Sequence, residues 1–445
     1  MELDMTKGRP MSVLLKFALP LMAGNLFQQF YNMADTIIVG RFVGADALAA
    51  VGATGIIMIL LTGFAQGITS GFSILTSQRY GAGDLKGVKR SVANGIVLSL
   101  AASAVLTVLS LASMRPLLHF MNTPEDIFQE AYTYIMVIGA GITASVFYNL
   151  FSAFLRAVGN SRVPLFFLIF SSCLNVALDL LFILCFGMGT QGAALATVAA
   201  QAASAILCGG YIYMKVPVLT PSAGMRKLNG HDARLQLSMG IPMGLQFAIT
   251  AFGGIVMQSA VNLFGTVAVA AYTAAGKLES LAEQGMVAIG QAAAVYGGQN
   301  FGKGDYKRIR EGARAALLAE ITYGILAALC MCAILESALR IFFSGDVDLA
   351  AMLPWAWTYT KICTAFFVPL STIFVFRNIM QGCGYGFLPM AGGIVEMAAR
   401  FLMAFAAMGM KNYAAACFCH PVAWTSAAVF LGGAYLWVMR KEKMG

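Results

Sequence analysis

Two acidic side chains lie inside long apolar stretches in the first half of the chain. Asp35 follows FQQFYNMA in the run 13–40, and Asp179 follows Asn175 by four residues in the run 163–185. Residues four apart share one face of a helix, so Asn175 and Asp179 would project together. Carboxyl and amide oxygens suit a small hard cation such as sodium, whereas crowded and desolvated carboxyls favour binding of a proton.

The elements that must position these side chains follow from the composition. The 445 residues are 59% hydrophobic and 11% charged, against about 25% charged in an average soluble protein. The apolar runs have the length of about 20 residues that a helix needs to cross a bilayer, and they are continuous rather than alternating, which excludes a transmembrane β-barrel. We therefore predict an all-α polytopic membrane protein with twelve transmembrane helices, near 13–40, 48–77, 91–113, 127–153, 163–185, 191–214, 236–262, 268–297, 311–335, 351–376, 388–408 and 413–438.

The depth of the polar residues brings four of them to one level. A charge at the bilayer centre costs roughly 2.5–3.5 kcal/mol, so an acidic residue there suggests a function. Counted from Pro164 at about 1.5 Å per residue, Asp179 lies about 22 Å along its helix, roughly 8 Å below the outer surface. Thr197 and Asp35 also fall in the outer halves of their spans. Two structural alternatives stay open: Asp35 could be hydrogen-bonded at a helix contact, and Thr197 could bond its own backbone.

The chain contains an internal repeat with a nearly constant offset. LKFALPLMAGNLFQQ at 15–29 corresponds to LSMGIPMGLQFAITA at 237–251, which aligns Pro20 with Pro242. QRYGAGDLKGVKR likewise corresponds to QNFGKGDYKRIR, and LRAVGNSRVP to MQGCGYGFLP. Each half carries six predicted spans, so the two halves should be related by an axis along the membrane normal.

This repeat predicts two pseudo-symmetric six-helix lobes with a central cleft. The N-terminal lobe would cover 1–218, the cytoplasmic inter-lobe linker 219–234 and the C-terminal lobe 235–445. Rocking of such lobes gives alternating access, which suits a transporter better than an enzyme or a receptor.

The Lys and Arg residues predict the orientation. Most of the 29 fall in loops on one side, with Arg377 counted among them, and the other side holds only Arg41, Arg115, Arg340 and Lys411. The positive-inside rule then places both termini in the cytoplasm of a plasma or inner membrane. The net charge of +9 is read as this topological signal and not as a nucleic-acid surface.

Charges also occur inside spans of the second half. Glu279 and Glu283 share a helix face, where like charges repel unless a cation or proton lies between them. Lys277 lies off that face, so another helix must supply their partner, and Glu396 and Arg400 are spaced for a direct pair. The set could be a buried ion-pair network, or its carboxyls could attract an organic cation.

Several segments together resemble the multidrug and toxic compound extrusion (MATE) family, in a prokaryotic branch of the flippase-like superfamily. They are FALPLMAGNLFQQFYNMADTIIVGRFVGADALAAVG, the Gly-rich loop after the second helix of each half, and AAYTAAGKLESLAEQGMVAIGQAAAVYGGQNFGKGD. The resemblance implies export of organic cations or other amphiphiles in exchange for protons or sodium ions, with no cofactor. It implies a proton or sodium site at Asp35, Asn175, Asp179 and Thr197, within a polar network of Gln28, Tyr31, Tyr134 and Asn149.

The second half departs from this pattern. Met257 stands at the position of Asp35, Arg400 at that of Asn175, and Thr250 where some branches carry an acidic residue. We therefore expect ion coupling in the first lobe only.

Three other functions fit the sequence less well. A flippase for a lipid-linked precursor would need a wide basic cavity, which only Arg400 and Lys277 could supply. An intramembrane enzyme would need a nucleophile with a base or a metal cluster, for which the His residues offer no arrangement. A sensor would show no ion-dependent flux. No GxxxxGK[ST] loop is present, so we expect no ATP use, and each chain is expected to work as a monomer in the bilayer on small-molecule substrates.

Overall fold

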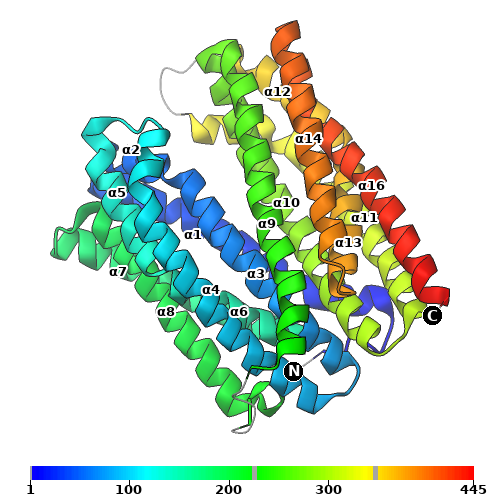
Figure 1. Cartoon of the computed structure of the whole chain (residues 1–445). Coiled ribbons are helices and arrows are strands. Elements are labelled where there is room, and N and C mark those ends of the chain that lie inside the picture. The colour runs from blue at the N-terminus through cyan, green and yellow to red at the C-terminus, as the bar shows by residue number, and fades with distance from the viewer. Residues whose placement is uncertain (1–2, 223–227, 344–348, 445) are drawn as a thin grey trace. The chain divides into compact units, whose positions relative to one another are not determined.

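The computed structural model describes residues 3–222, 228–343 and 349–444, and within these ranges it contains helices and no strand (Figure 1). Large apolar side chains such as Phe120, Leu402 and Ile206 are 83%, 74% and 73% exposed. In water such exposure would oppose folding, but in a bilayer lipid solvates these side chains and the helix satisfies its own backbone polar groups. Part of the predicted linker 219–234 and basic residues Arg226 and Lys227 lie outside the described residues.

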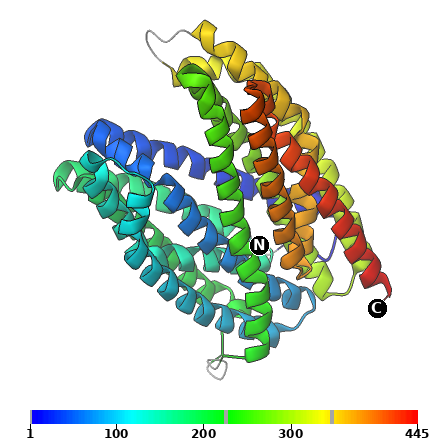
Figure 2. The same cartoon turned by 45° about the horizontal axis from the view of Figure 1, so that its top comes forward.

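The first compact unit comprises the N-terminal residues up to Asp4 and Ala23–Ala248. Its helices run side by side in both views of the molecule (Figures 1 and 2). They are most of α1 (Pro10–Phe42), then α2 (Ala45–Ala53), α3 (Gly55–Gly81), α4 (Leu85–Phe120), α5 (Glu125–Ala140), α6 (Ile142–Ala157), α7 (Arg162–Leu180), α8 (Gly189–Lys215) and the first part of α9 (Gly230–Val261).

The second compact unit comprises Met5–Met22 and Ile249–Gly445. It holds the start of α1 and the end of α9, so each of these two helices contributes to both units. The unit continues with α10 (Gly265–Gly302), α11 (Tyr306–Phe342), α12 (Leu349–Ala365), α13 (Phe367–Gly382), α14 (Phe387–Met410), α15 (Tyr413–Cys417) and α16 (Cys419–Met444). The two compact units are defined by contacts in space, whereas the predicted lobes are defined by sequence ranges. The lobes therefore stay a prediction.

The apolar helices account for the predicted spans. Nine runs of the described residues are long and apolar enough to cross a membrane, and up to eleven qualify if each bent helix pair is one span. One run, Gly230–Gly302, contains the two long helices α9 and α10. The runs therefore correspond to all twelve predicted spans.

Two predicted spans are bent rather than straight. The axes of α5 and α6 differ by 46°, and those of α12 and α13 by 48°. Between α5 and α6 stands Gly141, where a Cβ atom would overlap the side chain of Val198 on α8. The glycine thus permits a close approach of α8 at the bend, which a larger residue would prevent.

Small residues bring α3 and α9 close together within the first unit. A Cβ atom at Gly67 would lie 2.6 Å from the carbonyl oxygen of Met243, and one at Gly71 would overlap the backbone of Gly240. Glycines four apart on a helix form a flat stripe on which a second backbone can pack. This stripe fixes α9 against α3.

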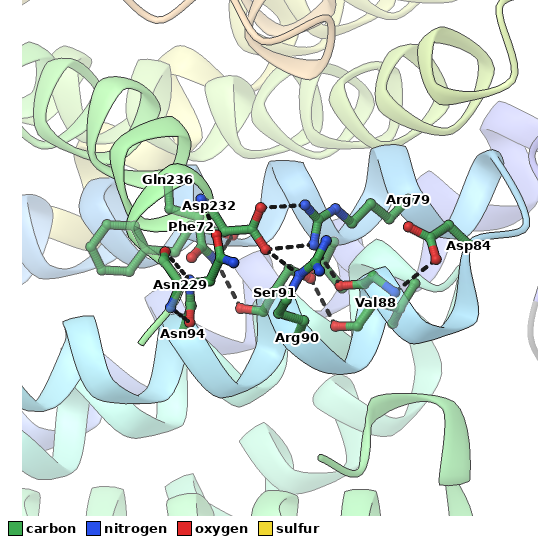
Figure 3. A network of polar contacts seen from close by, with 12 residues as sticks. Phe72, Arg79, Asp84, Val88, Arg90, Ser91, Asn94, Asn229, Asp232 and Gln236 are labelled. Carbon is green, nitrogen blue, oxygen red and sulfur yellow. Dashed lines mark hydrogen bonds and ion pairs between the residues drawn. The ribbon is translucent and has the colours of Figure 1, made fainter. Parts of the chain in front are cut away.

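A polar cluster, which we call the α9 anchor, holds the first turns of α9 to α3 and α4 (Figure 3). The Asp232 carboxylate is 1% exposed and accepts hydrogen bonds from both Arg79 and Arg90, the latter at 2.8 Å from Nε. Gln236 donates to the carbonyl oxygens of Phe72 and Ser91 at 3.0 and 2.9 Å. Asn94 and Asn229 complete the α9 anchor by exchanging hydrogen bonds of 2.9 and 3.0 Å.

The residues before α1 are held by backbone contacts. The amide of Leu3 donates to the carbonyl oxygen of Gly159 at 3.1 Å in the first unit. In the second unit the amide of Met5 donates to Gln299 at 3.0 Å, and Asn300 donates to the carbonyl oxygen of Met5 at 3.1 Å. Leu3 is therefore held by the turn that follows α6, and Met5 by α10 and the start of α11, where Arg308 also donates to its carbonyl oxygen.

Candidate functional site

The pairing of α7 with α8 positions the first two site residues. Ser171 on α7 donates to the carbonyl oxygen of Ala200, and Ser204 on α8 donates to that of Phe167. These reciprocal bonds fix the register of the two helices. Asn175 consequently reaches Thr197, and its Nδ2 donates to Oγ1 at 3.3 Å.

Asp179 lies one turn beyond Asn175, just before the regular α-helix ends. Asn175 and Asp179 are 1% and 0% exposed. The helix continues as a π-helical turn over Leu181–Cys185. Such turns widen the helix locally and are often found at functional sites.

Asp35 on α1 faces this pair from within the same unit. Its carboxyl interacts electrostatically with that of Asp179, and Tyr31 and Tyr134 interact with both carboxyls. Tyr31 also contacts Thr197. The structure thus brings six predicted residues into one cluster, here called the acidic cluster: Tyr31, Asp35, Tyr134, Asn175, Asp179 and Thr197.

The acidic cluster has oxygen atoms in excess of donors. Both carboxylate oxygens of Asp179, Oδ1 of Asp35 and Oδ1 of Asn175 are buried and have no hydrogen-bond partner among the described residues. Burying an unsatisfied polar group costs about 1–3 kcal/mol, and more when it is charged. Convergent oxygens of this kind are suited to share a proton or to ligate a small hard cation.

Two predicted members lie elsewhere. Gln28 is exposed on α1, and Asn149 is half-buried on α6. Neither takes part in a hydrogen bond or charge interaction with the acidic cluster in the described part of the chain. Their predicted place in the polar network therefore has no contact to support it in this conformation.

The second unit contains a separate set of buried charges. Glu279 on α10 is 5% exposed and accepts a hydrogen bond from the Tyr359 hydroxyl, while its Oε1 has no partner among the described residues. Glu283 is half-buried and interacts electrostatically with Glu279 and Arg400. Lys277 is exposed. The predicted partner from another helix is therefore Arg400 of α14.

The predicted pair of Glu396 and Arg400 is present but has a third member. Arg400 Nη2 donates to Glu396 Oε1 at 2.7 Å, and Arg377 Nη2 donates to Oε2 at 2.9 Å. Arg377, which the sequence placed among loop residues, is 9% exposed within α13. Sequence reasoning also missed Tyr359 as the partner of Glu279, because no sequence pattern connects α12 with α10.

The helical fold and its buried carboxyl groups together define a class of protein. Membrane-spanning helices from a duplicated half enclose buried carboxyl groups, which is the construction of a membrane transporter rather than an enzyme. The MatE family model matches the chain twice, over residues 20–181 and 242–406. These matches begin at Pro20 and Pro242, the residues that the internal repeat aligns. The chain belongs to the MatE family of multidrug and toxic compound extrusion transporters.

Similarity to named bacterial transporters supports this membership. "Probable multidrug resistance protein YpnP" of Bacillus subtilis is 32% identical over 69% of this chain and 68% of its own length. "FAD transporter" of Shewanella oneidensis is 24% identical over 83% of this chain and 81% of its own length.

Solved structures share the fold. "Crystal structure of MATE in complex with MaL6" has a TM-score of 0.92 at 19% identity and covers 100% of this chain and 99% of its own. A transporter from Pyrococcus furiosus, described as "Reverse polarity of binding pocket suggests different function of a MOP superfamily transporter", has a TM-score of 0.91 at 20% identity, with 99% and 98% covered. The predicted all-α membrane fold with twelve transmembrane helices is confirmed, as is the prediction that the protein is not an enzyme. Transporters of this family need no cofactor.

Proposed function

We propose that the protein is a secondary active multidrug efflux transporter that exchanges organic cations or amphiphilic compounds for protons or sodium ions by alternating access. The single observation that carries this proposal is the pairing of the half-buried Asp35 with the buried Asp179, whose oxygens, like Oδ1 of Asp35, are buried without a donor among the described residues. Multidrug relatives such as the Bacillus subtilis protein support the choice of substrate class.

In this proposal the acidic cluster binds the coupling ion. Asp35 and Asp179 repel each other when both are ionised, so binding of one proton or one sodium ion relieves the repulsion. Asn175 and Thr197 would supply neutral oxygens to the cation. Binding of the ion from the outer side would favour the outward-facing conformation, which is also the conformation that releases the substrate.

Glu279, Glu283 and Arg400 would form the part of the pathway that receives the cationic group of the substrate. Three carboxyls, those of Glu279, Glu283 and Glu396, stand against the guanidinium groups of Arg377 and Arg400. The set therefore has one negative charge in excess when all members are ionised. A monovalent organic cation or a proton would balance it.

The remaining parts of the proposal concern the chain in its membrane. The protein would act as a monomer without ATP, in the plasma or inner membrane, with both termini in the cytoplasm. Its two six-helix lobes, 1–218 and 235–445, would rock about the linker 219–234.

The test is efflux of a fluorescent lipophilic cation from proteoliposomes under a proton gradient or a sodium gradient imposed separately. We expect one gradient to drive efflux, and we expect Asp35→Asn and Asp179→Asn each to reduce the driven rate by at least about tenfold because the paired carboxyl is lost. Asp46→Asn, an exposed residue of α2, makes the same chemical change outside the acidic cluster and should leave the rate unchanged.

Two results would contradict the proposal. If neither gradient drives efflux of the dye, the proposal of ion-coupled drug export would be wrong. A flippase for a lipid-linked precursor would then be the next candidate. Full driven efflux in both Asn variants would show that coupling does not depend on the acidic cluster.

A further inference from the structure

Glu320 on α11 is a buried acid that the proposed function does not use. Glu320 is 0% exposed, and neither Oε1 nor Oε2 of its carboxyl group has a hydrogen-bond partner among the described residues. It lies in the second unit, on a helix that packs against α10, α12, α13 and α16. It does not belong to the set formed by Glu279, Glu283 and Arg400.

The hydroxyl groups beside Glu320 have already donated their protons. Ser371 on α13 donates to the backbone carbonyl oxygen of Glu320 itself at 3.2 Å. Tyr323, one turn further along α11, donates to the carbonyl oxygen of Ala282 at 2.9 Å. A hydroxyl has one proton to give, so neither group can solvate an ionised carboxyl at Glu320.

The neighbouring helices supply no compensating charge. The titratable or charged side chains that the structure describes on them are Tyr272, Lys277, Glu279, Glu283 and Tyr296 of α10, Tyr359, Lys361 and Cys363 of α12, Arg377 of α13, and Cys419, His420, Tyr435, Arg440 and Lys441 of α16. In the described part of the chain Glu320 interacts electrostatically with Tyr323 and with none of these groups. An ionised carboxylate here would have neither a hydrogen bond nor a counter-charge.

Side chains of α10 and α13 pack closely against α11 one turn from Glu320. Gly324, one turn from Glu320, allows the Ser371 hydroxyl and the Met286 methyl group to approach, at 3.1 and 3.2 Å from the position a Cβ atom would take. Ala316, one turn before, is also fully buried. The carboxyl is thus enclosed among α10, α11 and α13, and a neutral carboxyl is the form that such surroundings tolerate.

We infer that Glu320 is an additional proton-binding site of the second unit, which holds its proton in this conformation and exchanges it during transport. This inference rests on the proposed function, because exchange requires a second conformation of the cycle in which water reaches α11. The ligand is a proton and not a metal ion, since the described residues contain no group of three or more His, Cys, Asp or Glu side chains that could hold a metal.

The first test is infrared absorption of the full-length protein reconstituted in lipid at neutral pH. We expect the native protein to show an absorption of a protonated carboxyl that Glu320→Gln lacks and Glu320→Asp restores. Glu336→Gln, at an exposed position of the same helix, should leave the spectrum unchanged. An identical spectrum for the native protein and Glu320→Gln would mean that the carboxyl is ionised, and the inference would be overturned.

The second test counts protons. A pH-sensitive dye would measure the protons moved per substrate molecule exported, under whichever ion gradient drives efflux. We expect Glu320→Gln to move about one proton fewer per substrate than the native protein, and Glu336→Gln to match the native protein. An unchanged number of protons per substrate molecule in Glu320→Gln would overturn the proposal that Glu320 exchanges its proton during transport.

The two proposals can fail separately. If no gradient drives efflux but the infrared difference is present, the proposed function fails, and the exchange step fails with it while the protonated state stands. If driven efflux is normal and the infrared difference is absent, only the inference about Glu320 fails. Size-exclusion chromatography of each variant would confirm that it is folded.

Discussion

Glu396 is the one acidic side chain to which both Arg377 and Arg400 are bonded, and all three are nearly buried. Each carboxylate oxygen accepts a hydrogen bond from a different guanidinium group, so the single negative charge of Glu396 is shared between two cations. The spacing of four residues predicted the bond to Arg400 but not the bond to Arg377. That second bond depends on how α13 packs against α14, which no local pattern encodes.

At this site we expect Glu396→Gln to be strongly destabilising. The substitution removes the carboxylate to which both buried guanidinium groups are bonded, and breaking a buried ion pair in this way costs about 3–5 kcal/mol. Thermal unfolding of the detergent-purified protein would measure the loss against Glu336→Gln, which removes an exposed charge. A Glu396→Gln variant as stable as that control would show that the pair contributes little.

The acidic cluster shows how far single residues can be read from sequence. Helical spacing placed Asn175 and Asp179 on one face, and a depth argument placed Asp35 and Thr197 at a similar level. The structure brings these four together in the first unit. Gln28 is exposed instead, because its orientation around α1 depends on the packing of neighbouring helices rather than on depth.

At the scale of elements, the close approach of α3 and α9 depends on the absence of side chains. Alanine normally stabilises a helix relative to glycine by up to about 1 kcal/mol. A Cβ atom at Gly71, however, would overlap the backbone of Gly240, which cannot rotate away as a side chain would. Overpacking of this kind typically costs about 1–3 kcal/mol.

We therefore expect opposite effects from two identical substitutions. Gly71→Ala should lower the free energy of unfolding by about 1 kcal/mol or more, whereas Gly210→Ala should leave it unchanged or raise it, because a Cβ atom at Gly210 has no neighbour within 4 Å. Denaturant unfolding of both variants in the same detergent measures the difference. Equal effects of the two substitutions on the free energy of unfolding would mean that α3 and α9 can move apart at Gly71 without loss of stability.

Helix bends were the part of the element structure that sequence did not reveal. The predicted spans 127–153 and 351–376 are each predominantly apolar, and hydropathy alone carries no signal for a change of axis. Gly141 marks the first bend, where Val198 of α8 approaches the backbone. At the second bend, Phe366 separates α12 from α13, and Pro369 in the first turn of α13 has no N–H to donate to the carbonyl oxygen of Ala365. Span number and order, in contrast, follow directly from hydropathy.

At the scale of the whole molecule, the first unit depends on a helix that the second half of the sequence encodes. The α9 anchor and the glycine stripe both tie α9 to α3 and α4. A chain divided into one fragment ending at Ser222 and another beginning at Leu228 should therefore reassemble. We expect co-expressed fragments to co-purify through a tag on either one.

Substitutions in the second fragment give the control for this experiment. Asp232→Ala leaves the buried Arg79 without its carboxylate and should reduce co-purification several-fold, since such a loss costs about 1–3 kcal/mol. Glu336→Gln should have no effect. Independent stability of the first fragment, with no retention of the second, would show that α9 is dispensable to the first unit.

The division of α1 and α9 between the units also bears on ancestry. Each half of the sequence begins with a helix whose first part packs with the helices of the other half. A single-half ancestor built this way would have formed a homodimer by exchanging the ends of its first helix, as domain-swapped dimers do. In such a scheme, fusion of two copies would need only a linker to keep the exchange within one polypeptide, and the two halves could then carry different residues at matching positions, as Asp35 and Met257 do.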